Sequence, residues 1–529
     1  MTIARRLIVV VVAATAPPAW ATDLQGRVLS GDSPLPGAMV TAAALNNIET
    51  TVYSDAAGSF RFDRLPAGSY SVRARALGYD DATLNGAGGA DGADASAPLM
   101  LKLQAAQDWR LQAPSSSWLG LLPDGPQRRK FITNCDTCHE VAASRVIKDG
   151  APRDEARWTD AIKLMKSIDV YAMVPPAFDT TRNAHWLAEN LSAARIAGMQ
   201  RPAAPPPPAG TVITEYPMPE ADELPHDVAM GPDGRLWITA FWHSQVWALD
   251  PASGAIERFD VSTDKTQPAQ VRALAFDRQG ALWVILGGSK SLVRLDPKTR
   301  AFKTFPVGMY AHDLVIDSKG DVWVNDYFSK PERIGKLTVA TGEVSYYPLP
   351  SSNLPEAEGK PLPYGLQIDA QDRLWSTQLS GNTLVRFDTR TGTAKLYPMP
   401  EPDSGPRRHA VARDGSVWIP EFNDGFLDRF DPDTERFDRY DLGDSTIGAY
   451  DVAVNPVDGS VWITGSLENS LLRFDPRTHA IERYPLPTQK AFMRHLSIDP
   501  RDGAVWSAYS SLPTAVPKAV RLVRGVARP

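Results

Sequence analysis

Two cysteines and a histidine form the most distinctive chemical pattern in this chain. Cys135 and Cys138 are separated by two residues, and His139 follows directly. This spacing is typical of covalent haem attachment, in which both thiols bond to the porphyrin and the imidazole binds the iron. A structural zinc site would need four Cys or His ligands, and a redox dithiol would need a βαβ setting. The surrounding sequence supplies neither, so the motif predicts one covalently bound haem c.

The residues around the motif, 126–201, have helical periodicity. Short helices are expected over Arg128–Asn134, which leads into the motif, over Trp158–Ser167 and over His185–Ile196. A first helix that carries the motif and is packed by a terminal helix resembles a small class I cytochrome c domain. The resemblance implies an all-α haem domain over residues 126–201.

A methionine opposite His139 is expected as the second axial ligand of the iron. Met165 ends a Trp-x-x-x-Ile-x-x-Met helix that is similar to those of cytochrome domains fused to propellers, and it is the preferred candidate. Met173 precedes Val-Pro-Pro, similar to the Met-Pro turn of many cytochromes, and is the alternative; Met199 is a more distant one. Each could instead fill a core, the commonest role of methionine.

Composition narrows the possible classes of protein. The 529 residues are enough for three domains, and the net charge of -6 provides no basic field for nucleic acid. Only two cysteines exist, both in the motif, so a disulfide would consume the thiols that the haem needs.

Residues 1–21 are expected to be a Sec-type signal peptide. Arg5 and Arg6 form a basic start, Leu7–Ala14 an apolar run too short to span a bilayer, and Ala19-Trp20-Ala21 a cleavage site. A retained anchor is the alternative. No later stretch is apolar enough to cross a membrane, so we expect a periplasmic or secreted protein.

Residues 22–105 have the pattern of a small β-sandwich, with short alternating strands between Gly, Pro and Asp turns. The phrases Pro-Gly-Ala-Met-Val at 36–40 and Leu-Pro-Ala-Gly-Ser-Tyr at 65–70 resemble those of carboxypeptidase regulatory-like domains. The resemblance implies a transthyretin-like, carbohydrate-binding-like fold. Gly86–Ala97, made of small residues and Asp, is expected to be a flexible loop.

A proline-rich linker, 202–210, precedes a repeat region over 211–529. The phrase Asp-Gly-x-(Leu/Val)-Trp or a close variant recurs there with its tryptophans 40 to 52 residues apart. These tryptophans are Trp237, Trp283, Trp323, Trp375, Trp418, Trp462 and Trp506. Repeats of this length built from short strands indicate a β-propeller, in which the tryptophans pack between blades.

The two ends of the repeat region complement each other. The last repeat has a third strand, Ala519–Val523, but no fourth, whereas a fourth-strand phrase, Val212–Pro219, stands before the first repeat. A strand from the beginning should therefore complete the last blade and leave no open edge. The chain as a whole is expected to be multidomain and mainly β: a transthyretin-like sandwich, an all-α cytochrome c domain and a seven-bladed propeller.

The region 211–525, including the Tyr-Pro-(Leu/Met)-Pro ending of its fourth strands, resembles the virginiamycin B lyase family. Those enzymes open a cyclic depsipeptide by elimination, with a metal and a histidine base on one face of the propeller. The resemblance implies a ring of residues, one per blade near the start of its first strand. The corresponding residues here are His226, Arg272, His312, Tyr364, Arg407, Tyr450 and Arg494.

Only part of the catalytic set of the family matches. The base falls on Arg494 or the adjacent His495, the substrate-binding histidine falls on Tyr450, and His226 could also take part in catalysis. The metal-binding acids have no counterpart: residues 491–493 contain none, and none follows Trp506. Without those carboxylates a divalent metal has no hard-oxygen site there.

The ring could nevertheless bind a polar or anionic ligand, because Arg, His and Tyr side chains would converge on it. Asp326, Gln378 and Glu421 could supply acceptors. The alternative is that these side chains only satisfy backbone groups around a channel.

The leading hypothesis is an exported monohaem cytochrome c whose sandwich and propeller recognise a redox partner protein or a small polar ligand. The alternative is a lyase-like propeller enzyme with an accessory haem. A quinoprotein dehydrogenase is a third hypothesis, but many of those need a vicinal disulfide that this chain cannot form.

Overall fold

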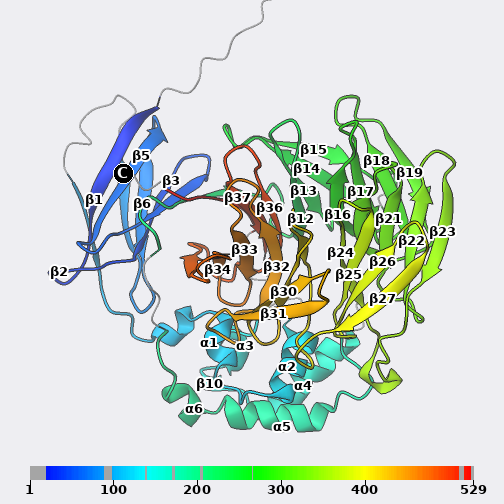
Figure 1. Ribbon diagram of the computed structural model, residues 1–529. Coiled ribbons are helices and arrows are strands. Elements are labelled where there is room, and N and C mark those ends of the chain that lie inside the picture. The colour runs from blue at the N-terminus through cyan, green and yellow to red at the C-terminus, as the bar shows by residue number, and fades with distance from the viewer. Residues whose placement is uncertain are drawn as a thin grey trace, which may run out of the picture.

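The structure, a computed structural model, describes residues 20–88, 98–136, 140–168, 173–202, 207–264, 266–510 and 517–525. A β-sandwich lies beside a β-propeller, and a layer of helices covers one face of the propeller (Figure 1). The predicted signal segment lies outside the described residues except for Trp20 and Ala21, with which the first strand begins. Within the described residues, no helix is both long enough and apolar enough to cross a bilayer.

The N-terminal part is a two-sheet sandwich, as predicted. Its strands are β1 (Trp20–Ser30), β2 (Ser33–Pro34), β3 (Met39–Ala43), β4 (Glu49–Tyr53), β5 (Ser59–Pro66), β6 (Tyr70–Arg75), β7 (Ala82–Ala87) and β8 (Leu99–Leu103). One sheet has the order β2-β1-β5 with β8 parallel to β1, and the other has β4-β3-β6-β7. Alternate residues of β6, Tyr70, Val72 and Ala74, point into the core between the sheets. The predicted loop starts later than Gly86, because β7 continues to Ala87; residues 89–97 lie outside the described part.

The middle of the chain is helical, and we call residues 115–197 the helical layer. Its helices are α1 (Ser115–Leu119), α2 (Pro126–Cys135), α3 (Ala143–Val146), α4 (Glu155–Ser167), α5 (Thr180–Asn190) and α6 (Ala193–Ala197). A short hairpin of β9 (Ile147–Lys148) and β10 (Ala151–Pro152) interrupts them. Pro126 occupies the first turn of α2, and Asp154 caps α4 by accepting a hydrogen bond from the Arg157 amide at 2.9 Å.

The expected single helix over 185–196 is two helices. Ser192, in an extended conformation (φ -71°, ψ 160°), separates α5 from α6. Serine favours the position before a helix over its interior, so a new helix starts after it.

The propeller has seven four-stranded blades, as predicted. Blade 1 contains β12 (Pro225–Met230), β13 (Leu236–Ala240), β14 (Gln245–Leu249) and β15 (Ile256–Asp260). Blade 2 contains β16 (Val271–Phe276), β17 (Leu282–Leu286), β18 (Ser291–Leu295) and β19 (Phe302–Pro306). Blade 3 contains β20 (Ala311–Ile316), β21 (Val322–Asp326), β22 (Arg333–Thr338) and β23 (Glu343–Pro348). Blade 4 contains β24 (Pro363–Ile368), β25 (Arg373–Gln378), β26 (Thr383–Asp388) and β27 (Thr393–Pro398).

The remaining blades follow the same order. Blade 5 contains β28 (Ala410–Val411), β29 (Val417–Glu421), β30 (Phe426–Asp431) and β31 (Arg436–Asp441). Blade 6 contains β32 (Ala449–Val454), β33 (Val461–Gly465), β34 (Ser470–Phe474) and β35 (Ile481–Pro485). Blade 7 contains β36 (Met493–Ile498), β37 (Val505–Tyr509), β38 (Lys518–Val523) and β11 (Val212–Pro217). All seven repeat tryptophans are buried, and that of blade 1, Trp237, packs against Val271 and Leu274 of blade 2.

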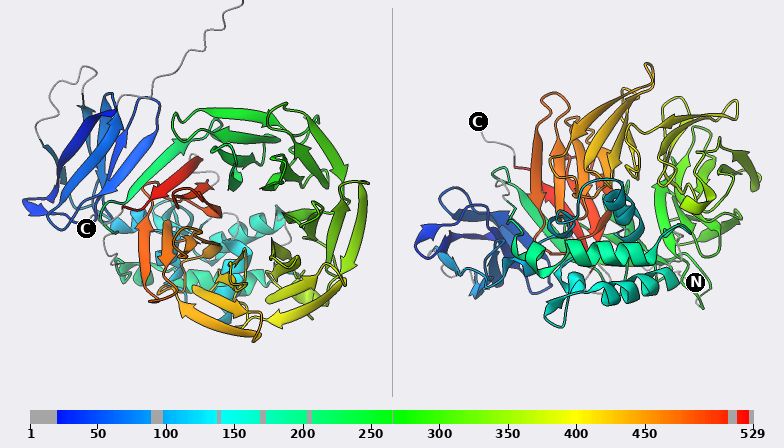
Figure 2. Two further views of the ribbon diagram at one scale, coloured as in Figure 1. Left: turned by 45° about the horizontal axis from the view of Figure 1, so that its top comes forward. Right: turned by 90° about the horizontal axis from the view of Figure 1, so that it is seen from below.

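The ring closes as the sequence predicts, because β11 pairs antiparallel with β38 from Val212↔Val523 to Pro217↔Lys518. The other edge of β11 pairs with β4 of the sandwich through Ile213↔Thr51, Thr214↔Thr50 and Glu215↔Glu49. Blade 7 and one sheet of the sandwich are therefore a single eight-stranded sheet. This continuous sheet attaches the blue sandwich to the red end of the ring in Figure 2.

Candidate functional site

An apolar cavity of about 180 Å³ lies inside the helical layer, at the end of α2 where the haem-attachment motif begins. Cys135, the last residue of α2, contributes to its wall together with residues of α4 and α5. The lining residues are Phe131, Cys135, Val141, Arg145, Arg153, Trp158, Ala161, Ile162, Leu164, Met165, Lys166, Val174, Phe178 and Leu187. The helices thus bring one thiol and one thioether to the same apolar hollow.

The polar side chains at this cavity include hydrogen-bond donors. The indole Nε1 of Trp158 is buried and has no hydrogen-bond partner among the described residues. Arg153 lies over the Trp158 ring, 5.7 Å from its centroid, and its Nε donates to the Arg145 carbonyl at 2.6 Å. Burial lowers the pKa of Arg145, while Glu140 and Asp136 oppose this effect. A ligand in the cavity would therefore meet apolar walls, an unused N–H donor and positive charge.

These residues fit a haem, which combines a flat apolar macrocycle with two carboxylates at one edge. Cys135 and Met165 line the cavity, while the predicted Cys138 and His139 lie outside the described residues. Met173 points elsewhere: it is buried, and its Sδ accepts a hydrogen bond from the Tyr327 hydroxyl of the propeller at 3.2 Å. Met199 is buried in the apolar core of the helical layer.

Asp136, inside the motif, is fully buried. Its Oδ1 accepts a hydrogen bond from the Val141 amide at 2.9 Å, which ties the start of the motif to the chain that follows it. Burial raises the pKa of Asp136 well above its usual range. The neutral acid is therefore the form that this position stabilises.

The ring residues, the seven predicted positions on the propeller, are all buried (His226 is the most exposed, at 6%). His312 connects two neighbours, with its ring centroid 6.0 Å from that of His226 and 3.9 Å from that of Tyr364. The hydroxyl groups of Tyr364 and Tyr450 are hydrogen-bonded, and Arg407 lies 4.5 Å above the Tyr450 ring. Five of the seven thus form one connected cluster.

The other two ring residues face aromatic neighbours. Arg272 lies 5.3 Å from the centroid of Phe241 and 5.0 Å from that of Tyr310. Arg494 lies 4.6 Å above the ring of Phe492 and donates to its carbonyl at 3.3 Å.

A second layer of charged residues, which sequence reasoning missed, lies directly after the ring residues in the chain. Arg408 is buried and donates to Asp227 at 2.9 Å and to Asp313 at 3.5 Å. Asp451 accepts the Leu496 amide at 2.6 Å. Counting one position beyond each ring residue gives Asp, Ala, Asp, Gly, Arg, Asp and His for blades 1 to 7, a pattern that could have revealed this network.

Burial governs protonation in this network. It lowers the pKa of His226 to about 3 and that of His312 well below the usual value, so both imidazoles are neutral at pH 7. It raises the pKa of Asp313 to about 6 against the opposing effect of Arg408. For Asp227, Arg408 and the hydrogen bond with His226 outweigh burial and hold the pKa below its usual range.

The remaining predicted residues serve local contacts. The carboxylate of Asp326 pairs with Arg333 Nε at 2.7 Å, and that of Glu421 pairs with Arg439 Nη2 at 2.6 Å. Gln378 Oε1 accepts a hydrogen bond from the Thr383 hydroxyl at 2.6 Å. Each of these side chains is therefore engaged within its own blade, although Glu421 Oε1 has no hydrogen-bond partner among the described residues. His495, the predicted base, is half-buried, and its Nδ1 has no partner within the described residues.

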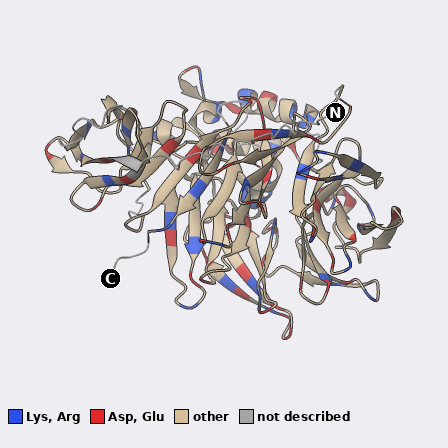
Figure 3. Cartoon of the chain, turned by 90° about the horizontal axis from the view of Figure 1, so that it is seen from above, with Lys and Arg blue, Asp and Glu red and all other residues tan. Residues whose placement is uncertain are grey.

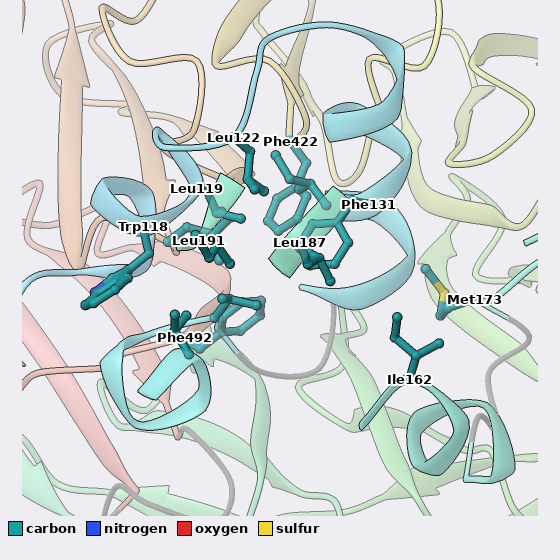
Figure 4. Packing of buried hydrophobic residues seen from close by; sticks show 14 of the residues in the cluster. Trp118, Leu119, Leu122, Phe131, Ile162, Met173, Leu187, Leu191, Phe422 and Phe492 are labelled. Carbon is teal, nitrogen blue, oxygen red and sulfur yellow. The ribbon is translucent and has the colours of Figure 1, made fainter. Parts of the chain in front are cut away.

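The helical layer covers the ring, an arrangement that the sequence did not indicate. Phe131, Leu187 and Met173 belong to the same apolar cluster as Phe422 and Phe492 of the propeller (Figure 4). Tyr364 and Tyr450 of the ring are part of this cluster too. The ring is therefore sealed by apolar packing on this side.

Polar contacts accompany this packing. Along α2, Arg128 Nη2 donates to Ser445 Oγ at 2.9 Å, Arg129 pairs with Glu401 at 3.4 Å, and Lys130 pairs with Glu358 at 3.0 Å. Asn423 Nδ2 donates to the hydroxyl of Thr133, two residues before the motif, at 2.6 Å. Elsewhere, Lys and Arg are interspersed with Asp and Glu over the chain (Figure 3).

Comparison with known proteins identifies two parts of the chain. The virginiamycin B lyase family model matches residues 186–358 and 353–513, more than half of the sequence. The chain belongs to the virginiamycin B lyase family. The carboxypeptidase regulatory-like domain model matches residues 23–101. None of the three matched ranges includes residues 102–185, where the haem-attachment motif lies.

Solved structures agree with the family assignment at the level of fold. A streptogramin B lyase is 23% identical, with a TM-score of 0.52 over 59% of this chain and 97% of its own. Virginiamycin B lyase from Staphylococcus aureus is 19% identical, with a TM-score of 0.51 over 60% of this chain and 100% of its own. A catalytically inactive histidine-to-alanine variant of that enzyme, with quinupristin, is 19% identical to this chain. Its TM-score is 0.52 over 60% of this chain and 100% of its own. The comparison with curated protein sequences gives no match.

Proposed function

We propose that this family member is an exported c-type cytochrome that transfers electrons through one covalently bound haem c in its helical layer. The observation that carries the proposal is the shared cavity of Cys135, Met165 and the unpartnered indole N–H of Trp158. The sequence supports it, because Cys138 and His139 complete the attachment motif. The expected compartment is the periplasm or the exterior, to which the basic and apolar N-terminus would direct the chain.

Each residue of the cavity has a distinct role in this proposal. Cys135 and Cys138 would form the two thioether bonds, and His139 and Met165 would bind the iron. When bound, the haem supplies reversible one-electron transfer. The apolar walls would exclude water, and together with the Met165 thioether they would favour the less charged, reduced form of the bound group. The indole N–H of Trp158 and the guanidinium of Arg153 would hold the haem carboxylates.

The propeller acts as a rigid support in this proposal. Its ring residues are covered, so a small ligand has no open path to them from the helical side. A redox partner protein that docks on the helical layer needs no such path, and we therefore favour it over a small polar ligand.

The test is the mass and visible spectrum of the exported protein made in a host that attaches haem c. We expect the polypeptide mass plus one haem, and a reducible spectrum that survives denaturation. The double variant Cys135→Ser, Cys138→Ser should have the bare mass and no such spectrum. Met199→Ala, outside the cavity wall, is the matched control and should keep both. A bare mass for the wild-type protein would overturn the proposal.

Lyase activity is the second candidate, and membership of the family favours it. The buried ring and the absence of matching metal-binding acids in residues 491–493 oppose it. Incubating the holoprotein with quinupristin and following the mass of the cyclic peptide tests this candidate. Turnover that is lost in His495→Ala and His226→Ala would establish it.

A further inference from the structure

A cluster of one imidazole and two carboxylates lies at the seam where the propeller ring closes. Glu220 and Asp222 belong to the connection between β11, the outer strand of blade 7, and β12, the inner strand of blade 1. His243 belongs to the connection between β13 and β14 of blade 1. One ligand atom from each of the three side chains lies within 4.8 Å of the other two. Two chain segments thus place N and O donors around one point.

A fourth residue, outside this trio, fixes the orientation of the imidazole. The carboxylate of Glu223 is completely buried, and its Oε2 accepts a hydrogen bond from His243 Nδ1 at 2.6 Å. Glu223 also accepts the amides of Leu224 at 2.7 Å and Trp242 at 2.9 Å, so its position is rigid. Because Nδ1 donates to this carboxylate, Nε2 is the nitrogen left to face Asp222, whose Oδ1 is 3.7 Å away. A carboxylate that orients the far nitrogen of a histidine is the usual support for a metal ligand.

The negative charge of the cluster also favours a cation, although Arg258 already neutralises part of it. Three carboxylates, those of Glu220, Asp222 and Glu223, gather around His243, and the cationic partner of Glu220 is Arg258, at 2.6 Å. The side chains of Asp222 and His243 are 84% and 32% exposed, so an ion can reach them from solvent.

We propose that Glu220, Asp222 and His243 form a binding site for a divalent transition-metal ion of the zinc type, supported by Glu223. One imidazole with two carboxylates suits Zn²⁺ better than Mg²⁺ or Ca²⁺, which take oxygen ligands. Water would fill the remaining positions. The ion would connect the β11–β12 segment to blade 1 and so hold the closing strand in place.

Zinc titration of the haem-loaded full-length protein by calorimetry, after treatment with a chelator, tests this proposal. We expect one saturable site for Zn²⁺, with Mg²⁺ binding at least tenfold more weakly. His243→Ala and Asp222→Asn should each weaken Zn²⁺ binding at least tenfold, and Glu223→Gln by about 10- to 100-fold. Asp222→Asn is the safest variant, because this side chain is exposed and its loss leaves the fold intact.

The matched control is His185→Ala. His185 Nδ1 also contacts a carboxylate, Glu155 Oε2, at 2.9 Å, but forms a simple exposed pair. This variant should bind Zn²⁺ like the wild-type protein. Zn²⁺ should raise the unfolding temperature of the wild-type protein and of His185→Ala, and leave that of His243→Ala unchanged. Equal losses in the two histidine variants, or no saturable binding by the wild-type protein, would refute the site without bearing on the haem.

Discussion

Two methionines of the helical layer have different surroundings. Met165 lines the cavity that Cys135 also lines, whereas the sulfur of Met173 accepts a hydrogen bond from Tyr327 of the propeller. Sequence spacing alone left both as axial-ligand candidates. These positions suggest separate roles. Met165 would contact the proposed haem, and Met173 packs between the helices and the propeller.

Replacing each methionine should separate these roles. In haem-loaded protein, Met165→Ala should lower the midpoint potential and let added cyanide bind quickly, because the iron loses its sixth ligand. Met173→Ala should keep the potential but lower the free energy of unfolding by about 2–4 kcal/mol, through the cavity that it leaves. Redox titration and denaturant unfolding measure the two effects, and the opposite pattern would make Met173 the ligand.

Three buried carboxylates of blade 5 surround one guanidinium. Arg439 Nη2 contacts Glu421 at 2.6 Å and Asp424 at 2.7 Å, and its Nε lies 3.8 Å from Asp428. Burial, reinforced by Glu421, raises the pKa of Asp424 to about 8 and that of Asp428 to about 9. Both acids are therefore neutral in the folded protein at pH 7.

This cluster should make stability depend on pH. Between about pH 4, where an unfolded Asp titrates, and pH 9, the folded state binds more protons than the unfolded state. The free energy of unfolding should therefore fall as pH rises through this window, by at most about 1.4 kcal/mol per pH unit for each group. Asp428→Asn should make the decline shallower in urea unfolding at pH 5 to 9. Asp431→Asn, on the same strand, should leave the slope unchanged, because the pKa of Asp431 is lowered by backbone hydrogen bonds.

At the scale of elements, β11 is the strand that joins the sandwich to the propeller. Its Glu215 is fully buried where β11 lies between β38 and β4. Lys518 of β38 reaches Glu215 at 3.2 Å and Glu49 of β4 at 2.8 Å. One ammonium group of β38 thus neutralises carboxylates from two other strands, β11 and β4.

Lys518→Met should lower the free energy of unfolding by about 3 kcal/mol at pH 7, because it leaves a buried carboxylate without its cation. The loss should shrink at pH 5, since burial already raises the pKa of Glu215 and a protonated acid needs no partner. Glu49→Gln should cost less than about 1 kcal/mol, because Glu49 keeps partial contact with water. Urea unfolding of the wild-type protein and both variants at pH 5 and pH 7 measures these losses. An equal loss for Lys518→Met at the two pH values would mean that Lys518 stabilises by packing alone.

At the scale of the whole molecule, the helical layer covers the ring through apolar contacts and a few ion pairs. The pair of Lys130 and Glu358 is part-exposed, whereas Phe422 is completely buried. Exposed ion pairs contribute little to stability, and a buried aromatic ring contributes several kcal/mol. Apolar packing should therefore decide whether the layer stays docked.

Phe422→Ala should loosen the layer, with faster hydrogen exchange in α2 and α5 and a loss of about 3–5 kcal/mol in the free energy of unfolding. Glu358→Gln should change the exchange of neither helix and cost less than about 1 kcal/mol. Hydrogen–deuterium exchange with mass spectrometry distinguishes the two. Acceleration in Glu358→Gln but not in Phe422→Ala would show that charge, not packing, holds the layer in place.

The sequence predicts features that repeat along the chain or that depend on residues close together in it. The recurring Asp-Gly turn and Trp237-type strand indicate the blades, and the complementary phrases at 212–219 and 519–523 indicate ring closure. The spacing also singles out Cys135 and Met165, which line the same cavity. The sequence does not predict the pairing of Thr50 with Thr214 or the covering of Tyr364 by helices. Both depend on how surfaces formed by residues far apart in the chain fit together.

The position of β11 between two partners has a consequence for how the protein is made. Val212–Pro217 leaves the ribosome long before Lys518–Val523, its neighbour in blade 7. Until Lys518–Val523 has been made, β4 of the sandwich is the partner available to this strand, and it occupies one edge. A chain that stops before residue 518 would keep blade 7 unfinished, with a free edge that invites aggregation. Completion of blade 7 therefore depends on a strand that is made long after β11.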